Sequence, residues 1–212
     1  VLRDGLTRLD LTRDDGPATA WLAALPAAAF SAIEPRAADW LAPVELAYLC
    51  RLDVPRRRQS YLLGRVAAKR AVLRYLGIAD PRAVTVDRGV FQQPVVRAAA
   101  FDVPGVSVSH TDGWAVAVAH PAGHPLAVDV EAVTPERAAT VRAHLTPDEA
   151  AMLGRTGVSP TVLWAMKEGL GKVLRCGLTV PLEVLAVSEL TTDIDGRAAG
   201  TFRHFLQYRA VG

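Results

Sequence analysis

The stretch Trp164-Ala165-Met166-Lys167-Glu168-Gly169-Leu170-Gly171-Lys172 carries the most specific pattern in the chain. It lies within a predicted helix that runs from about Ser159 to Arg175. Along this helix Trp164, Glu168 and Lys172 follow one another at intervals of four residues, so their side chains share one face. Taken alone, Glu168 and Lys172 are explained as an exposed helix pair, worth about 0.2–0.5 kcal/mol.

A second acidic pattern lies in Leu126-Ala127-Val128-Asp129-Val130-Glu131, which alternates with a period of two. The alternation predicts a strand with Asp129 and Glu131 on one face, as part of a β-hairpin from Trp114 to Val133. Neighbouring carboxylates repel each other unless a cation or solvent separates them. A hard divalent ion such as Mg²⁺ suits this pair, and Glu168 adds a third carboxylate. A solvated strand face is the alternative explanation.

A third pattern is the long helix predicted from Pro55 to Leu76 and ended by Gly77. Lys69 falls on the apolar stripe of this helix, and Arg58 and Arg65 point in nearly the same direction. A buried cation needs an anionic partner, and the phosphates of a bound ligand would serve. The alternative is that the long side chains reach solvent from the rim of the core.

Shorter elements are predicted from local signals. Proline, glycine and capping residues mark helices at Asp39 to Cys50 and from Thr146 onward. The predicted strands are Val84 to Val86, Pro94 to Val96, Val106 to His110, Trp114 to Ala119, Val184 to Val187 and Thr201 to Tyr208.

The order and spacing of these patterns resemble the 4′-phosphopantetheinyl transferases, in the long monomeric class that serves secondary metabolism. The segments that carry the resemblance are Gly64–Lys69, Val106–Thr111, Val128–Glu131 and Trp164–Glu168. The resemblance implies an α+β fold, a pseudo-twofold monomer of two similar halves with coenzyme A between them. The halves are expected at residues 1–105 and 106–212, and the second carries the metal-binding carboxylates.

The resemblance also implies a reaction. Such enzymes move the 4′-phosphopantetheine arm of coenzyme A onto a serine of an apo acyl or peptidyl carrier protein. The reaction releases 3′,5′-ADP and depends on Mg²⁺. Phosphoryl transfer relies mainly on positioning and charge stabilisation, so carboxylates for Mg²⁺ and a few fixed cations are the parts required.

Carried over residue by residue, the resemblance assigns roles to residues of this chain. Asp129, Glu131 and Glu168 would hold Mg²⁺, and Glu168 is also the candidate base for the serine hydroxyl. Lys167 and Lys172 would neutralise the pyrophosphate and the leaving group. The residues expected to bind coenzyme A are Arg58, Arg65, Lys69, Gln93, Pro94, Ser109, His110 and Lys172.

Two positions depart from the family pattern. Gln92-Gln93-Pro94 stands where many members have Gly-Lys-Pro, so one phosphate-contacting lysine is missing. Gly169 stands where members usually have Ala or Ser after Lys-Glu. Glycine inside a helix costs up to about 1 kcal/mol.

Composition excludes several other classes of protein. The chain has 212 residues, a net charge of +2 and 50% hydrophobic residues, which is typical of an ordinary globular protein rather than a nucleic-acid binder. Its two cysteines exclude a disulfide framework. The apolar stretch from Ala18 to Ile33 is too short and too interrupted to span a membrane. The absence of an export signal and of paired cysteines favours the cytoplasm, and the resemblance implies a monomer.

Two rival functions remain open at this stage. The first is a non-enzymatic coenzyme A- or nucleotide-binding protein, which would bind its ligand with metal but without transfer. The second is a nucleic-acid-binding module that uses the arginines between Arg51 and Arg74, which predicts a steep salt dependence of binding. The weak net charge and the 6% aromatic content place the second last.

Overall fold

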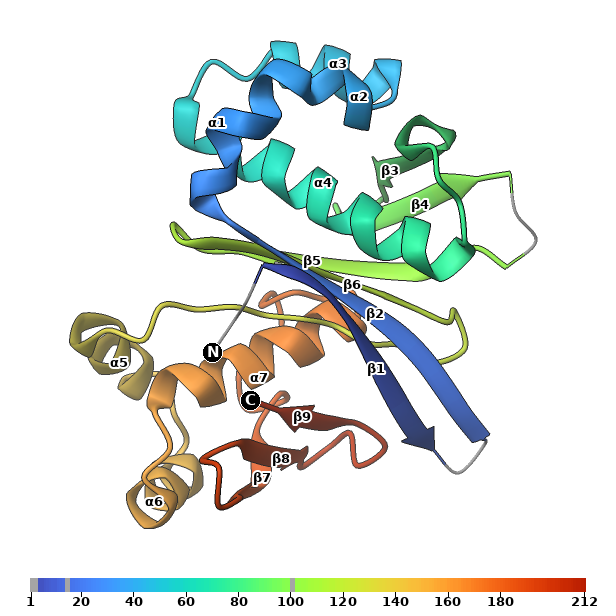
Figure 1. The fold of residues 1–212 in the computed structure, drawn as a ribbon. Coiled ribbons are helices and arrows are strands. Elements are labelled where there is room, and N and C mark those ends of the chain that lie inside the picture. The colour runs from blue at the N-terminus through green and yellow to red at the C-terminus, as the bar shows by residue number, and fades with distance from the viewer. Residues whose placement is uncertain (1–3, 14–15, 100–101) are drawn as a thin grey trace. The chain divides into compact units, whose positions relative to one another are not determined.

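A computed structural model describes residues 4–13, 16–99 and 102–212. The chain divides into two compact units, Val1–Val130 and Glu131–Gly212, which are called here the first and the second unit. Each unit combines helices with antiparallel strands, so the expected α+β class is confirmed (Figure 1). The expected halves, 1–105 and 106–212, describe the pseudo-twofold symmetry that the resemblance implies. This division stays a prediction.

The first unit is built on a four-stranded antiparallel sheet in the order β1-β2-β6-β5. Its strands are β1 (Gly5–Arg13), β2 (Gly16–Pro26), β5 (Gly105–His110) and β6 (Trp114–His120). The long helix α4 (Pro55–Leu76) packs on one face of this sheet and contacts β2, β5 and β6 (Figure 1). The elements around α4 are α1 (Phe30–Ile33), α2 (Ala37–Trp40), α3 (Pro43–Cys50) and the two-stranded ribbon of β3 (Val84–Arg88) and β4 (Pro94–Ala98).

Small residues bring α4 close to the sheet. A β-carbon added at Gly64 would lie 3.3 Å from Cγ1 of Val108 on β5, so even a methyl group would crowd this crossing. Alanines fill much of the rest of the interface, because they occupy little space between a helix and a sheet. The fully buried ones are Ala23 on β2, Ala67, Ala68 and Ala71 on α4, and Ala117 and Ala119 on β6.

Local signals predicted α4 correctly. The helix begins at Pro55 and ends before Gly77, which adopts a left-handed φ of 68° and closes the last turn. The single helix predicted from Asp39 to Cys50 is wrong, because α2 ends at Trp40 and α3 begins at Pro43. The proline pushes the preceding residue into an extended conformation and so interrupts the helix.

The predicted hairpin from Trp114 to Val133 is also wrong. β6 is paired on one side with β2 and on the other with β5, so it has no free edge for a further strand. Leu126 to Glu131 is instead an extended segment outside the sheet. The hydroxyls of Ser107 and Ser109 on β5 accept hydrogen bonds from the backbone N–H groups of Val128 and Val130, each at 3.3 Å.

The second unit packs three helices with a three-stranded antiparallel sheet in the order β7-β8-β9. The elements are α5 (Pro135–Arg142), α6 (Pro147–Thr156), α7 (Pro160–Val173), β7 (Val187–Thr192), β8 (Ala198–Phe202) and β9 (Arg209–Val211). The core of the unit places Leu163, Met166 and Leu170 of α7 with Val187 and Phe202. This packing fixes which face of α7 is left for polar residues.

The helix starts of this unit follow their capping signals. Thr146 caps α6 and accepts from the backbone N–H of Glu149, and Ser159 caps α7. The predicted strand at Val184 to Val187 is wrong, since residues 184 and 185 lie in a turn and β7 begins only at Val187. The alternation there was too weak to fix the start of the strand. The strand predicted from Thr201 to Tyr208 is wrong as well, because β8 ends at Phe202 and bends and turns follow it.

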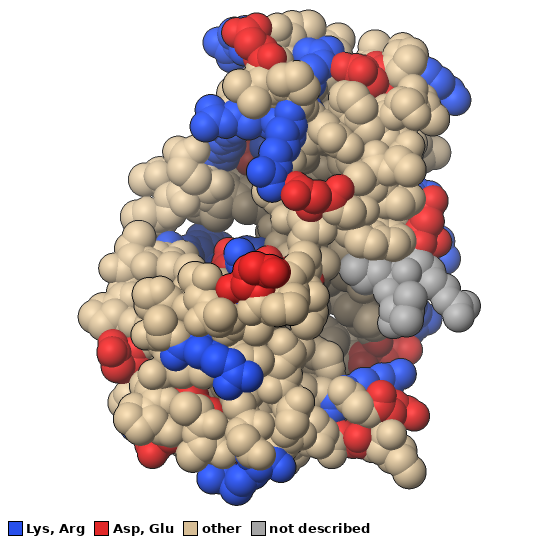
Figure 2. Space-filling model, turned by 90° about the vertical axis from the view of Figure 1, so that its left-hand side faces the viewer, with Lys and Arg blue, Asp and Glu red and all other residues tan. Residues whose placement is uncertain are grey.

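Charged side chains of both signs are interspersed on the face drawn in Figure 2. This agrees with the small net charge of +2. In the part of the chain that the structure describes, no helix combines the length and the apolar character needed to cross a membrane.

Candidate functional site

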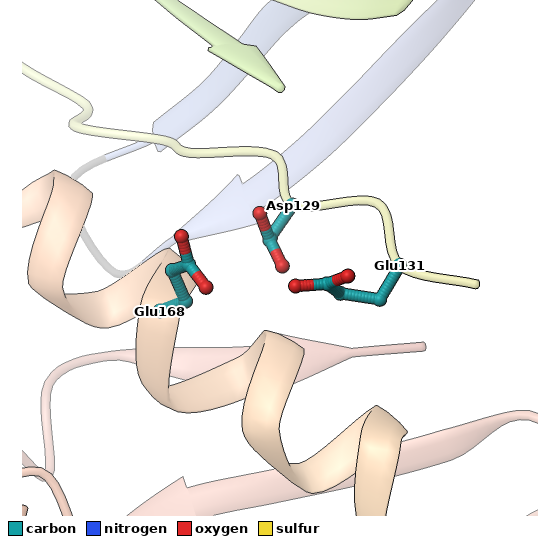
Figure 3. A group of neighbouring side chains, drawn as sticks. All are labelled: Asp129, Glu131 and Glu168. Carbon is teal, nitrogen blue, oxygen red and sulfur yellow. The ribbon is translucent and has the colours of Figure 1, made fainter. Parts of the chain in front are cut away.

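Three carboxylates form the acidic cluster, defined as Asp129, Glu131 and Glu168 (Figure 3). One side-chain oxygen from each lies within 4.8 Å of the others, and all three residues are half-buried. Asp129 and Glu131 come from the extended segment that follows β6, and Glu168 comes from α7. Three anions at this spacing repel one another, and partial burial strengthens the repulsion.

Each member of the acidic cluster makes a hydrogen bond or an ion pair with a neighbouring side chain. Ser109 donates its hydroxyl to Oδ1 of Asp129 at 2.8 Å. The indole Nε1 of Trp164 donates to Oε2 of Glu168 at 3.1 Å. Arg137 pairs with Oε1 of Glu131. These contacts orient the carboxylates before any ligand binds.

The donor set of the acidic cluster fits a hard divalent cation. Mg²⁺ and Mn²⁺ prefer carboxylate oxygens and retain positions for water and phosphate. Arg137 neutralises part of the negative charge of Glu131, which leaves a site for one cation rather than for several. The residues present therefore suit the metal that the sequence led us to expect.

The two lysines of α7 lie in different surroundings. Lys167 is only 1% exposed and pairs with Glu149 at 2.9 Å, so it is an interior residue. Lys172 is half-buried and lies one turn beyond Glu168 on the same face of the helix. Of the two, Lys172 is the one placed to meet a ligand near the acidic cluster.

A pocket of about 620 Å³ lies in the first unit, at the start of α4 and the end of β5. We call it the basic pocket. Its lining residues include Arg56, Arg57, Arg65, Arg88 and His110. The carboxylate among the lining residues is that of Asp112, which pairs with Arg56 at 2.6 Å. The lining therefore carries a clear excess of positive charge.

Two tyrosines arrange the guanidinium groups of the basic pocket. The ring centroids of Tyr48 and Tyr61 lie 4.8 Å apart. Cζ of Arg88 lies 4.3 Å from the centroid of Tyr48, and Cζ of Arg65 lies 4.8 Å from the centroid of Tyr61. Burial raises the pKa of Tyr61 above its usual 10.0, although the charge of Arg65 opposes this shift. Tyr61 is therefore a neutral hydroxyl that donates to the carbonyl of Glu45 at 3.3 Å.

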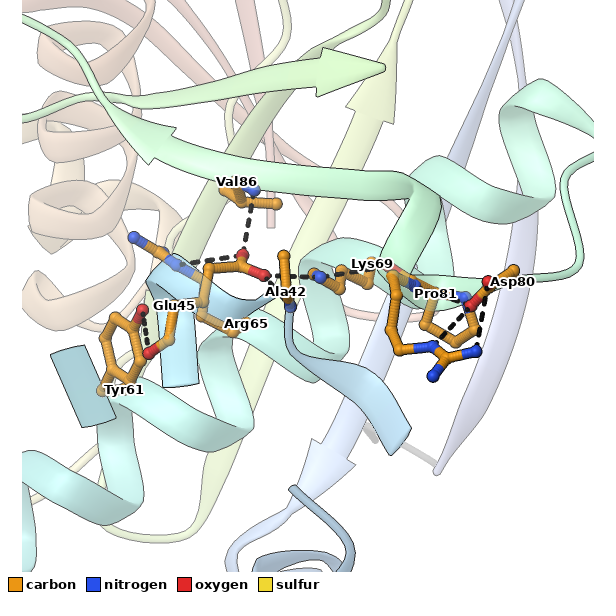
Figure 4. A network of polar contacts seen from close by, with 9 residues as sticks. Ala42, Glu45, Tyr61, Arg65, Lys69, Asp80, Pro81 and Val86 are labelled. Carbon is orange, nitrogen blue, oxygen red and sulfur yellow. Dashed lines mark hydrogen bonds and ion pairs between the residues drawn. The ribbon is translucent and has the colours of Figure 1, made fainter. Parts of the chain in front are cut away.

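Other expected coenzyme A ligands have partners inside the protein. Lys69 is fully buried and pairs with Glu45 at 2.5 Å, and it also donates to the carbonyl of Pro81 at 3.0 Å (Figure 4). Burial lowers the pKa of Lys69, while the contact with Glu45 raises it. The anionic partner that the apolar stripe of α4 required is thus a residue of the chain. Arg58 similarly donates to Glu34 at 2.6 Å and to the carbonyl of Leu49.

The remaining candidates for coenzyme A binding lie at a turn, at the acidic cluster and in the basic pocket. Gln93 accepts a hydrogen bond from the N–H of Phe91 at 2.9 Å, so its side chain organises the turn before β4, which begins at Pro94. Ser109 donates its hydroxyl to Asp129 of the acidic cluster. His110 is exposed and lines the basic pocket, as a phosphate ligand would.

Sequence reasoning missed the two buried glutamates that pair with Lys69 and Lys167. Glu45 is 3% exposed and Glu149 is 0% exposed. A signal for both was present, because Leu41 to Leu49 and Leu145 to Leu153 share the pattern Leu-x-Pro-x-Glu-x-x-x-Leu. The repeated pattern places a glutamate at the third position of a helix that begins with proline.

The chain was compared with known proteins. No protein-family model and no curated protein matches it. Among solved structures, a holo-(acyl-carrier-protein) synthase from Bacillus anthracis in complex with CoA (3′,5′-ADP) is 18% identical, with a TM-score of 0.45, over 48% of this chain and 93% of that one. A holo-ACP synthase from Plasmodium yoelii is 17% identical, with a TM-score of 0.43, over 56% of this chain and 97% of that one. Both likenesses cover only about half of this chain.

Proposed function

We propose that this protein is an Mg²⁺-dependent 4′-phosphopantetheinyl transferase that uses coenzyme A. The observation that carries the proposal is the convergence of Asp129, Glu131 and Glu168 into one cluster. Those residues come from the two segments that most specifically resemble the transferases. A solvated strand face, the alternative explanation of the pair, does not account for the third carboxylate arriving from α7.

The acidic cluster and α7 would supply the chemistry. Asp129, Glu131 and Glu168 would hold Mg²⁺, which supplies charge neutralisation at the pyrophosphate when bound. A serine oxygen of the carrier protein forms a bond to the phosphorus that bears the pantetheine arm, and the bond from that phosphorus to the bridging oxygen breaks. Glu168 accepts the serine proton, and the electron pair departs with 3′,5′-ADP. Lys172 stabilises the negative charge of the leaving group.

The basic pocket would hold the phosphorylated nucleotide end of coenzyme A. Guanidinium groups bind phosphate with two parallel hydrogen bonds, and four arginines line the pocket. Tyr48 and Tyr61 hold the guanidinium groups of Arg88 and Arg65 in place for such contacts. Arginines thus take the role that the resembled family gives in part to a lysine, which is absent at Gln93.

The acceptor would be an apo acyl carrier or peptidyl carrier protein of secondary metabolism. We propose that the enzyme acts as a cytoplasmic monomer, with neither nucleic acid nor membrane as a partner. A metal-assisted coenzyme A-binding protein without transfer is the competing function, because the basic pocket alone would serve it.

The deciding experiment is intact-protein mass spectrometry of several apo carrier proteins after incubation with the chain, coenzyme A and Mg²⁺. A mass gain of one phosphopantetheine arm that disappears with EDTA is the expected result. If no carrier of either type gains mass while calorimetry shows coenzyme A binding, the binding-only function replaces the proposal.

A further inference from the structure

The same buried ion-pair arrangement occurs in both units. In the first unit, Oε2 of Glu45 pairs with Lys69 at 2.5 Å and accepts from the backbone N–H of Ala42 at 2.9 Å. Oε1 of Glu45 accepts from the N–H of Val86 on β3 at 2.9 Å (Figure 4). We call this arrangement a glutamate–lysine clamp.

The second unit repeats the clamp contact for contact. Glu149 pairs with Lys167 at 2.9 Å, and its Oε2 accepts from the N–H of Thr146 at 2.9 Å. Its Oε1 accepts from the N–H of Val187 on β7 at 3.0 Å. Each clamp therefore joins the start of one helix, a lysine of the longest helix of its unit, and the backbone of a strand.

A buried ion pair is a poor source of stability. The cost of removing two charges from water often cancels their attraction, so an apolar pair of similar volume can be equally stable. What such a pair provides is a single geometry, because a misplaced partner leaves a buried charge uncompensated. The presence of this clamp in both units is therefore better explained by the helix position that it fixes than by a gain in folding stability.

On α7 the clamp is directly followed by a member of the acidic cluster. Consecutive residues of a helix differ by about 100° in direction, so Lys167 points into the core while Glu168 points toward the cluster. Lys167 is fixed against Glu149, which is itself held by the N–H of Val187. This fixes both the rotation and the axial position of Glu168. In the first unit the residue after Lys69 is Arg70, which pairs with Asp4 at 3.2 Å, so that clamp positions no acid.

We infer that Glu149 and Lys167 are positioning residues that aim Glu168 at the metal. The inference rests on the proposed function in taking the acidic cluster as the metal site. It assigns Lys167 a role different from the phosphate contact expected at first. A side chain that is 1% exposed and already paired has no surface to offer a pyrophosphate.

The chain supplies its own matched control. We would compare the double variant Lys167→Met/Glu149→Gln with Lys69→Met/Glu45→Gln, which removes the other clamp. The readout is the dissociation constant for Mn²⁺, measured by calorimetry without coenzyme A or carrier protein, together with thermal unfolding. Both variants should unfold at a lower temperature. Only the α7 variant should weaken Mn²⁺ binding, by at least fivefold, while the control stays within twofold.

Three outcomes overturn the inference. The first is equal Mn²⁺ affinity in the two double variants. The second is unchanged Mn²⁺ affinity with weaker coenzyme A binding in the α7 variant, which would restore the phosphate contact. The third is a wild-type protein that binds no Mn²⁺, which would also overturn the metal site of the proposed function. A wild type that binds Mn²⁺ but transfers nothing overturns only the proposed function.

A milder variant covers the case in which the double variant does not fold. Glu149→Asp keeps both charges and shortens the acceptor by one methylene, which loosens the contacts to Lys167 and Val187. It should weaken Mn²⁺ binding about threefold, and Glu45→Asp should not. Equal Mn²⁺ affinity of these two variants and the wild type also overturns the inference.

Discussion

Trp164 and Glu168 are joined by a hydrogen bond along one face of α7. The indole Nε1 lies 3.1 Å from Oε2 of the carboxylate, one turn further along the helix. The indole also lies near His144, whose ring centroid is 6.0 Å away. Trp164 therefore lies against His144, which follows α5, and its indole N–H holds one of the two carboxylate oxygens of Glu168.

Replacing Trp164 with phenylalanine should therefore weaken metal binding without removing a ligand. A hydrogen bond to a charged group contributes about 1.5–3 kcal/mol, so the Mn²⁺ dissociation constant should rise about tenfold. Calorimetric titration measures the change. The same affinity as wild type would show that the indole N–H does not orient the carboxylate.

Replacing Glu168 with glutamine should abolish transfer and leave the fold intact. The amide cannot accept the serine proton, and general-base catalysis contributes about 100-fold or more to the rate. Circular dichroism and thermal unfolding should match the wild type. Glu183→Gln is the matched control, since Glu183 is an exposed glutamate of the same unit, and its transfer rate should be unchanged. A fully active Glu168→Gln protein would remove this residue from the mechanism.

Replacing Arg88 with alanine should weaken binding of 3′,5′-ADP about tenfold, because one charge-assisted contact to phosphate is lost. Arg88 donates to the Tyr48 hydroxyl at 2.6 Å and lies over its ring, so the guanidinium is already in place. Arg88→Lys keeps the charge but loses the planar group, and it should bind with intermediate affinity. Equal affinity of all three proteins in calorimetry would place the nucleotide outside the basic pocket.

The two glycines of α7 should respond oppositely to alanine. Leaving aside its own helix, no heavy atom among the described residues lies within 4 Å of a β-carbon built at Gly169, so Gly169→Ala should stabilise the protein by about 0.5–1 kcal/mol. A β-carbon at Gly171 would lie 2.3 Å from the carbonyl oxygen of Gly177. Gly171→Ala should therefore destabilise it by about 1–3 kcal/mol. Urea unfolding of both variants checks the signs.

Acid should remove a stabilising contribution of Asp80. Hydrogen bonds from the backbone N–H and the side chain of Arg82 lower the pKa of this carboxyl below its usual 3.8. A lowered pKa in the folded state stabilises the protein above the usual value, and the effect is lost as the pH falls through the lowered pKa. Asp80→Asn should therefore unfold at a lower temperature than wild type at pH 6, and the gap should close at about pH 2. A gap that stays constant with pH would contradict this assignment.

Local signals in the sequence predicted α4, α6 and α7, but they missed α5 and merged α2 with α3. Of the four strands in the sheet of the first unit they predicted only β5 and β6. Pro55 and Gly77 mark the ends of α4 by the geometry of their own backbone, which needs no distant partner. β2 contains four alanines and was not predicted as a strand, since alanine is depleted in strands. It is a strand because it pairs with β1 on one side and with β6 on the other and places Ala23 in the core beneath α4, which is a tertiary cause.

In the candidate site, too, the sequence predicted what depends on neighbouring residues and missed what depends on the packing of distant elements. The spacing of Asp129 and Glu131 predicted that their carboxylates lie together, with Glu168 as a third, and the structure brings the three together although the predicted strand does not form. Glu45 lies 24 residues before Lys69 in sequence, and nothing local connects the two. The partner of a buried charge depends on how distant elements pack, so the sequence alone could not distinguish an internal glutamate from a ligand phosphate.

The two glutamate–lysine clamps bear on how such a chain could diversify during evolution. In each unit the lysine of the clamp secures the helix, and the residue that follows it differs between the units. That residue is Arg70 after Lys69 and Glu168 after Lys167. Anchoring and chemistry are therefore carried by adjacent but separate positions. A substitution of the residue after the clamp lysine can change what that helix face offers to a ligand, while the helix stays packed in the same position. An ancestral unit with this layout could be copied, and one copy could gain or lose reactivity without either copy ceasing to fold.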